Sequence, residues 1–194
     1  MPKIFTDDDR NNIRSVLLKN GRKALEKNSC KNISVAELAA EAGIAKGTFY
    51  SFFPSKEEFF YEIMLQIRDE NRRELNALAE KPSYQKAYEL FYSRYTCVKT
   101  VYDYFTPEEL KIIFRKIPDK HSEADENSIQ LAQKLISVCT DNKSIKAEVV
   151  VNLMNLAAAA SANRDFFIAE HYNETIAVLS KAIADYIFDV KKEN

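Results

Sequence analysis

Residues 34–50 read SVAELAAEAGIAKGTFY, and this stretch decides the fold. It predicts two short helices around a tight turn. Ser34 and Glu37 have the spacing of a capping box, which satisfies free backbone donors at a helix start. Gly43 can adopt the left-handed conformation that ends the first helix, and Ile44 and Phe49 are placed to fill the angle between the helices. This is the helix-turn-helix pattern, in which the second helix enters the major groove of DNA.

An ordinary corner between two packed helices is the alternative interpretation of these residues. In the DNA-binding interpretation, the small size of Ala39 and Gly43 is expected to let the second helix cross closely. The charge pattern favours DNA binding. The chain has a net charge of −1, whereas residues 10–56 hold nine Lys and Arg against three Glu, a net charge of +6. Such asymmetry is typical of a small DNA-reading module beside a neutral or acidic domain, although charge also fluctuates along any chain.

Length and composition bound the fold class. The chain has 194 residues, enough for one or two domains with a sizeable core. Apolar residues make up 46% and charged residues 29%, which is typical of a globular protein rather than a disordered one. Three glycines and five prolines are few for this length. Because turn-forming residues are scarce, we expect an all-α fold of about nine long or short helices.

The N-terminus and the cysteines indicate a cytoplasmic protein. The first residues are polar and charged rather than an apolar signal segment, and the longest apolar stretch, residues 156–160, is too short to span a bilayer. The three cysteines are odd in number, widely spaced and without a CxxC pair, which favours reduced, buried thiols. A redox-sensing thiol is the alternative. The cysteines are Cys30, Cys97 and Cys139.

Breaks and caps divide the rest of the chain. Thr6 is expected to cap a first helix that ends near Lys27, and Pro54 with Ser55 separates the second short helix from a long one that ends near Glu80. Residues 84–95 carry aromatic side chains at helical spacings, and further helices are expected after Thr106, from 122, at 144–163 and at 173–190. We predict a helix-turn-helix domain at residues 1–54 and a helical ligand-binding and dimerisation domain at residues 55–194.

The helix-turn-helix segment resembles the TetR family of bacterial transcriptional regulators. The resemblance covers residues 10–60 and rests on residues that keep register with the family. They are Ser34-Val35, Glu37-Leu38-Ala39, Glu41-Ala42-Gly43-Ile44, Lys46-Gly47-Thr48-Phe49-Tyr50 and Phe53-Pro54-Ser55-Lys56-Glu57-Glu58. The resemblance implies a homodimer whose N-terminal domains bind two half-sites of a palindrome. It also implies C-terminal domains that dimerise through the last two helices and hold a small-molecule pocket.

Two positions depart from the family pattern. Ala45 stands where relatives often have Ser or Thr, so a helix cap and a contact to DNA are expected to be missing there. Phe52 stands where a His or Tyr is common, which removes a polar contact to DNA. On the first helix, Arg14 and Arg22 are further candidates for phosphate contacts, with a solvated surface role as the alternative.

The second short helix supplies most of the expected contacts to DNA. Lys46 is expected to reach a base edge or a phosphate, Gly47 to let the backbone approach the groove, and Thr48 to offer a hydroxyl or a methyl group. Tyr50 and Lys56 match phosphate-binding positions of the family, and core packing is the rival role for Tyr50. The predicted DNA-binding set is Ser34, Lys46, Gly47, Thr48, Tyr50, Ser51 and Lys56.

An aromatic-rich stretch is the candidate ligand pocket. Eight of the 22 residues at positions 84–105 are Tyr or Phe, and several have helical spacing. Tyrosine rings combine apolar area with a hydroxyl that can orient a ligand. Aromatic stripes on helices also form ordinary cores, and the sequence leaves both interpretations open. The candidate pocket residues are Tyr88, Phe91, Tyr92, Tyr95, Tyr102 and Phe105.

The last two helices are expected to pair with those of a second copy in a four-helix bundle. The small residues at 157–162 suit close approach of another backbone. The alternative is that these apolar faces pack only within one subunit. The candidate interface residues are Leu153, Leu156, Ala157, Ala160, Ile176, Leu179, Ile183 and Ile187.

An enzyme is the main rival class, and the sequence disfavours it. The chain has no Gly-rich phosphate loop, no serine elbow and no HExxH motif. His121 with Glu123 and Asp125 suits a metal site or, alternatively, a solvated loop. We predict no catalytic residue, no metal and no cofactor. The predicted function is a ligand-responsive transcriptional repressor that binds a palindromic operator as a homodimer and is released by a small molecule. The alternatives are a helix-turn-helix regulator controlled by a protein partner and an architectural DNA-binding protein.

Overall fold

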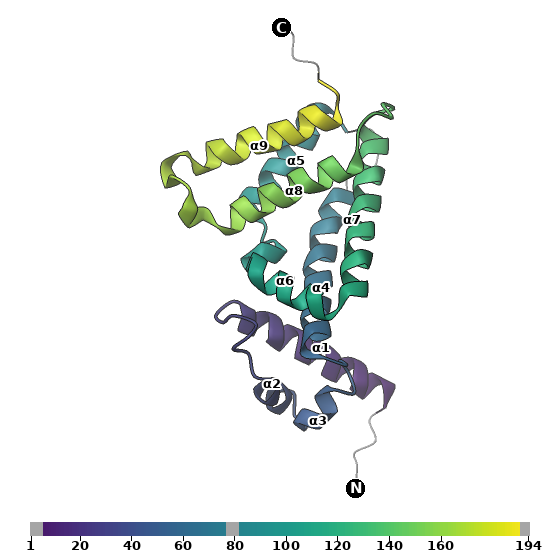
Figure 1. The fold of residues 1–194 in the computed structure, drawn as a ribbon, viewed down its shortest axis with the longest axis vertical. Helices are drawn as coiled ribbons and strands as arrows, with labels where there is room; N and C mark the ends of the chain where they lie inside the picture. Colours follow the sequence, from purple (N-terminus) through teal and green to yellow (C-terminus); the bar gives the residue numbers. More distant parts are fainter. Residues whose placement is uncertain (1–5, 77–81, 191–194) are drawn as a thin grey trace. The chain divides into compact units, whose positions relative to one another are not determined.

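The regular structure of this chain is helical throughout the parts described here. The computed structural model describes residues 6–76 and 82–190 (Figure 1). Within these ranges lie nine α-helices and three short 3-10 segments, so the all-α prediction is confirmed. The α-helices are α1 (Asp7–Leu25), α2 (Val35–Glu41), α3 (Lys46–Phe49), α4 (Lys56–Asn76), α5 (Tyr84–Cys97), α6 (Pro107–Lys116), α7 (Pro118–Cys139), α8 (Ala147–Ala162) and α9 (Tyr172–Ile187). The 3-10 segments are η1 (Val101–Asp103), η2 (Arg164–Phe166) and η3 (Ala169–His171).

Most helix starts lie where the capping residues predict them. Thr6 and Thr106 form complete capping boxes at α1 and α6, and Ser34 accepts a hydrogen bond from the backbone of Glu37 at α2. The helix predicted from residue 122 is an exception, because α7 begins at Pro118. A proline suits the first turn of a helix, where its missing N–H needs no partner. The predicted end of the long helix, near residue 80, lies outside the described residues.

The chain divides into two compact units, which are described separately. Among the described residues, the N-terminal unit comprises 6–66 and 104–118, and the C-terminal unit comprises 67–76, 82–103 and 119–190. Helix α6 therefore belongs to the same unit as the helix-turn-helix although it follows α5 in sequence. This division differs from the predicted boundary between residues 54 and 55, which concerns function and stays a prediction.

Aromatic rings form the core of the N-terminal unit. The rings of Phe49, Phe53 and Phe59 pack together with centroids 4.9–5.4 Å apart, and all three side chains are fully buried. Helices α1 and α4 cross closely at Gly21. A Cβ atom placed there would lie 2.3 Å from Cζ of Phe59, so only glycine fits this crossing without rearrangement. This core fixes α3 against the two longer helices.

The core of the C-terminal unit lies where α5, α7, α8 and α9 meet. Helices α8 and α9 run side by side, with α5 packed against α9 (Figure 1). Phe91 and Tyr95 of α5 are buried in this core together with Ile176, Ile183 and Ile187 of α9. No helix within the described ranges is long and apolar enough to cross a membrane.

Candidate DNA-binding site

The turn between α2 and α3 depends on the backbone conformation of Gly43. Its φ is +69°, in the left-handed region that favours glycine. The N–H of Gly43 donates to Ala40 O at 3.0 Å, and the N–H of Ile44 donates to Ala39 O at 3.0 Å, which closes the end of α2. A Cβ atom on Gly43 would meet nothing within 4 Å. The expectation that its small size permits the helix crossing is therefore wrong, whereas Ala39 is fully buried.

Helix α3 presents a largely exposed surface over a buried anchor. Phe49 is fully buried, while Lys46 and Gly47 are exposed and Thr48 is half-buried. Tyr50 is 45% exposed, and its ring meets that of Phe49 edge to face at 5.3 Å. The phenol therefore stands on the core without entering it. This arrangement leaves the predicted contact residues of α3 accessible to another molecule.

The two departures from the family pattern have visible structural consequences. Ala45 occupies the N-cap position of α3 and makes no side-chain cap hydrogen bond. Phe52 is buried, with the Arg10 guanidinium 4.8 Å from the centre of its ring. Ser51 is exposed, but its hydroxyl donates to Thr48 O at 2.7 Å. Its hydroxyl must therefore exchange or share that bond to contact a phosphate.

Lys56, the first residue of α4, reaches the connection that leads into α2. Its Nζ donates to Lys31 O at 3.1 Å and lies 5.6 Å from the ring centre of Phe60. Partial burial lowers the pKa of Lys56 below its usual value. An ammonium group carries three N–H donors, so this bond leaves others available for a phosphate. Ser34 lies three residues after Lys31, at the start of α2.

The two arginines of α1 are engaged within the N-terminal unit. Arg14 Nη1 donates to Phe52 O at 3.0 Å, and its guanidinium also pairs with Glu62. Arg22 Nε donates to the hydroxyl of Tyr104 at 3.3 Å. These contacts fasten α1 to α4 and to the segment before α6. The sequence could not indicate these partners of the two arginines, because the contacts join residues that lie 38–82 positions apart in the chain.

The predicted pocket residues do not all belong to the same compact unit. Phe105 lies in the N-terminal unit and packs on Phe60, with ring centroids 5.9 Å apart. The other five lie in the C-terminal unit. There Tyr88 and Tyr92 stack at 6.3 Å and are half-buried, as is Tyr102, whereas Phe91 and Tyr95 are buried in the core.

The predicted interface residues divide into core and surface positions. Four of them are fully buried within the single chain, because other helices of the same chain cover the faces of α8 and α9 on which they lie. They are therefore core residues and are not available to a partner. These four are Ala157, Ile176, Ile183 and Ile187. Ala160 is nearly buried, Leu153 and Leu179 are half-buried, and Leu156 is 56% exposed.

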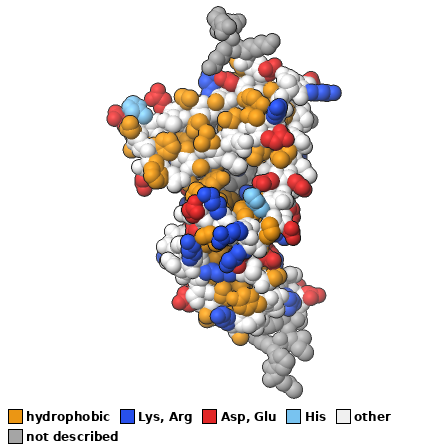
Figure 2. All heavy atoms as spheres, viewed as in Figure 1, with side chains coloured by type: hydrophobic (Ala, Val, Ile, Leu, Met, Phe, Trp, Pro, Cys, Tyr) orange, Lys and Arg blue, Asp and Glu red, His pale blue; other side chains and the backbone are white. Residues whose placement is uncertain are grey.

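Sequence reasoning missed other exposed apolar residues near this surface. Phe166 is 88% exposed and Ile168 is 75% exposed, both in the connection between α8 and α9, and Val178 on α9 is also exposed. Figure 2 shows hydrophobic side chains over α8 and α9. We call Leu156, Phe166, Ile168 and Val178 the apolar surface of the C-terminal unit. The signal in the sequence was weak, because Phe166 and Ile168 lie outside the helical repeat.

The remaining candidates are a metal site at His121 and a redox-sensing cysteine. His121 Nε2 lies 3.7 Å from Asp125 Oδ2, and both side chains are exposed. No group of three side chains suited to a metal ion occurs within the described residues. Burial and the neighbouring Glu109 carboxylate raise the pKa of Cys30 to about 12, which disfavours the reactive thiolate.

Sequence comparison identifies the helix-turn-helix. Residues 17–63 match the family described as bacterial regulatory proteins, tetR family. Within these residues, the chain is similar to the TetR family. This is a family of regulatory proteins rather than enzymes. A 76-residue segment is 36% identical to the HTH-type transcriptional regulator EthR of Mycobacterium tuberculosis and covers 39% of this chain. The match spans about a third, 34%, of the length of that relative.

Two solved structures have a fold similar to that of this chain over most of its length. The fatty acid degradation regulator FadR from Bacillus halodurans superimposes with a TM-score of 0.54 and 15% identity, covering 98% of this chain and all of that one. A tetR-family regulator from Streptomyces coelicolor gives a TM-score of 0.56 and 16% identity, covering 94% of this chain and 82% of that one. At these identities the likeness concerns the fold alone.

Proposed function

We propose that this chain is a transcriptional repressor that binds a palindromic operator as a homodimer and is released by a small molecule. The observation that carries DNA binding is the surface of α3. Lys46, Gly47 and Tyr50 are exposed there while Phe49 anchors the helix, within a segment that matches a family of regulatory proteins. A four-residue helix offers few contacts, so one copy binds weakly. Two copies spaced by roughly one helical turn, about 34 Å, supply affinity and require a palindrome.

Selection of bound fragments from the source genome tests DNA binding and finds the operator. A palindrome among the fragments supports the proposal, and an absence of any preference over random competitor DNA contradicts it. Binding to the selected duplex across a salt series then tests the individual residues. Lys56→Ala is expected to weaken binding to all sequences alike and to reduce the salt slope by about one unit per subunit. Lys46→Ala is expected to reduce discrimination by about 1–3 kcal/mol for a bidentate base contact.

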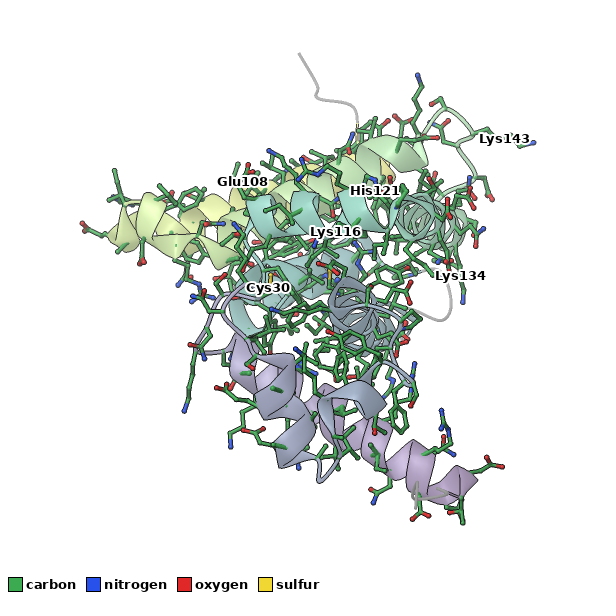
Figure 3. The ribbon with its side chains drawn as sticks, turned by 60° about the horizontal axis from the view of Figure 1, so that its bottom comes forward. Cys30, Glu108, Lys116, His121, Lys134 and Lys143 are labelled. Atoms are coloured by element: carbon green, nitrogen blue, oxygen red, sulfur yellow. The ribbon has the colours of Figure 1, made fainter. Side chains whose placement is uncertain are left out.

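A matched control separates these effects from a general loss of charge. Lys143 is an exposed lysine in the connection between α7 and α8, labelled in Figure 3. Lys143→Ala removes the same charge far along the chain from the helix-turn-helix and is expected to leave the operator affinity and the salt slope unchanged. If Lys46→Ala and Lys56→Ala also bind like the parent protein, α3 is not the DNA-reading helix.

Polar atoms buried in the C-terminal unit support a small-molecule sensor. The Tyr95 hydroxyl is fully buried beside Arg94, and burial raises the pKa of Tyr95 to about 12. Neither this hydroxyl nor Arg94 Nε meets hydrogen-bond geometry with any described residue. Buried polar groups are usually satisfied, so these two atoms are suited to bind a polar group of a ligand. Mass spectrometry of small molecules released from the purified, denatured protein tests this directly.

The apolar surface of the C-terminal unit supports a homodimer. Four exposed apolar side chains from α8, α9 and their connection suit burial against a second copy. Sedimentation of the parent protein is expected to give a dimer, and Leu156→Glu is expected to give a monomer at micromolar concentration. Gln130→Glu adds the same charge at an exposed position of α7 and is the control. A monomeric parent protein would contradict the dimer.

A further inference from the structure

Glu109 of α6 is a buried carboxylate that joins two distant segments of the N-terminal unit. Its side chain is only 5% exposed. Oε1 accepts hydrogen bonds from the Ser29 hydroxyl at 2.5 Å and from the Cys30 N–H at 2.8 Å. Oε2 accepts from the N–H and the hydroxyl of Thr106, at 2.9 and 3.0 Å. One side chain therefore completes the cap of α6 and holds the connection between α1 and α2.

The connection held by Glu109 leads directly into the helix-turn-helix. Ser29 and Cys30 are followed by Lys31, whose carbonyl accepts the bond from Lys56, and then by Ser34, the cap of α2. Residues 29–34 are thus held by α6 through Glu109 and by α4 through Lys56. Helix α3 packs against α2, so the segment that Glu109 holds leads into both DNA-reading helices.

Helix α6 has further contacts within the same unit. Lys116 Nζ pairs with Glu57 Oε1 at 2.5 Å, and the rings of Phe114 and Tyr61 lie 6.2 Å apart. In sequence, however, α6 is preceded and followed by segments of the C-terminal unit, at 82–103 and 119–190. Helix α6 is therefore linked through the backbone to segments of the C-terminal unit on both sides.

The geometry points to Glu109 as a positioning residue: its buried carboxylate fixes the connection between α1 and α2 to the cap of α6, and this attachment places the DNA-reading helices. This inference rests on the proposed function and names a residue on which operator binding depends. Glu109 need not touch DNA or a ligand, because it acts on the segment that places α2. Its neighbour Glu108 is exposed and pairs with Lys111. The two adjacent carboxylates thus differ in burial and partners, and Glu108 is the matched control.

Cys30 reports whether this attachment is intact. Its thiol is buried, and its backbone N–H is one of the groups that Glu109 holds (Cys30 and Glu108 are labelled in Figure 3). A buried thiol reacts with an alkylating reagent only when its surroundings open. Cys139, half-buried in the C-terminal unit, reports on that unit in the same sample. Peptide mass spectrometry measures both labelling rates separately.

The experiment compares Glu109→Gln with Glu108→Gln in the full chain. An amide has one acceptor oxygen, so it cannot accept from both the Ser29–Cys30 pair and Thr106. We expect Glu109→Gln to raise the labelling rate of Cys30 about tenfold or more, the range for losing hydrogen bonds to a charged group. The rate at Cys139 is expected to stay within twofold, and Glu108→Gln is expected to change neither. Unchanged labelling of Cys30 in Glu109→Gln overturns the inference. A parallel rise at Cys139 overturns it too, because it shows general loosening.

Measurement of operator affinity completes the test. It also distinguishes a failure of the inference about Glu109 from a failure of the proposed function. With the selected operator duplex, Glu109→Gln is expected to bind at least tenfold more weakly than Glu108→Gln; equal affinities overturn the inference. If the parent protein binds no duplex, the proposed function fails, while the labelling result still decides the attachment. If Glu109→Gln does not fold, Ser29→Ala replaces it. That variant removes one donor and leaves the α6 cap intact, and the same outcomes apply to it.

Discussion

Gly47 offers the sharpest test of whether α3 is a DNA-reading helix. A Cβ atom added there would meet nothing within 4 Å, and the residue does not have the positive φ found at Gly43. Nothing within the chain therefore requires glycine at this position. Alanine is favoured over glycine inside a helix by about 0.5–1 kcal/mol. Because α3 has only four residues, we expect Gly47→Ala to stabilise the free protein by about 0.5 kcal/mol, the lower end of that range.

Binding to the operator is expected to change in the opposite direction. If the backbone of Gly47 approaches the groove, a methyl group there pushes α3 away and weakens its base contacts, which are worth about 1–3 kcal/mol each. Thermal unfolding measures the first effect, and fluorescence anisotropy with a labelled operator duplex measures the second.

Gly43→Ala is the comparison variant for this prediction. It forces a side chain into a left-handed conformation, at a cost of about 1–2 kcal/mol, so stability and DNA binding are both expected to fall. A Gly47→Ala protein that is more stable and binds the operator as tightly as the parent would refute the reasoning, because the backbone at Gly47 would then have no close neighbour in the complex.

Three further predictions concern stability. Gly21→Ala is expected to destabilise the N-terminal unit by about 1–3 kcal/mol or more in denaturant unfolding, because the added Cβ meets the ring of Phe59 at 2.3 Å. Burial alone would raise the pKa of Glu109, but hydrogen bonds from Ser29, Thr106 and Cys30 outweigh it and lower the pKa to about 2, from 4.5. Since the folded pKa lies below the unfolded one, this stabilisation is complete above pH 4.5. It is lost as the pH falls towards 2, and it amounts to about 3 kcal/mol. Between pH 5 and pH 2, the free energy of unfolding of the parent protein is therefore expected to fall by about 3 kcal/mol more than that of Glu109→Gln. Equal falls would contradict the lowered pKa of Glu109. Tyr95→Phe is expected to stabilise the ligand-free chain by about 1–3 kcal/mol in thermal unfolding, because it removes a buried hydroxyl that meets hydrogen-bond geometry with no residue in the described ranges. A loss of stability would show that the hydroxyl is satisfied, with Arg94 beside it as the nearest candidate.

Structural features that depend on a few neighbouring residues could be predicted from the sequence. The capping residues at Thr6, Ser34 and Thr106 mark helix starts, and Gly43 marks the left-handed turn. Each of these depends on neighbours within about four positions, so one chain is enough to infer it. The start of α7 was placed four residues late because a serine was preferred as a cap over Pro118. Both residues suit a first turn, and only packing decides between them.

Contacts between residues far apart in the chain could not be predicted from the sequence. Glu109 was identified as part of a capping box, but nothing in its surroundings indicates Ser29 and Cys30, which lie 80 and 79 positions earlier. Phe105 was grouped with the aromatic residues before it, whereas it packs on Phe60 in the other unit. Helical spacing shows which residues share a face, but not which element covers that face.

Helices α8 and α9 show how far such spacing can be taken. The pattern correctly found an apolar face on α9, yet Ile176, Ile183 and Ile187 are covered by helices of the same chain. A helix that packs only within its own subunit needs one apolar face, with polar residues opposite. Here Leu156 and Val178 remain exposed on helices whose other faces already contribute to the core. The excess of apolar surface, rather than the buried stripe, is therefore the feature that favours a second copy.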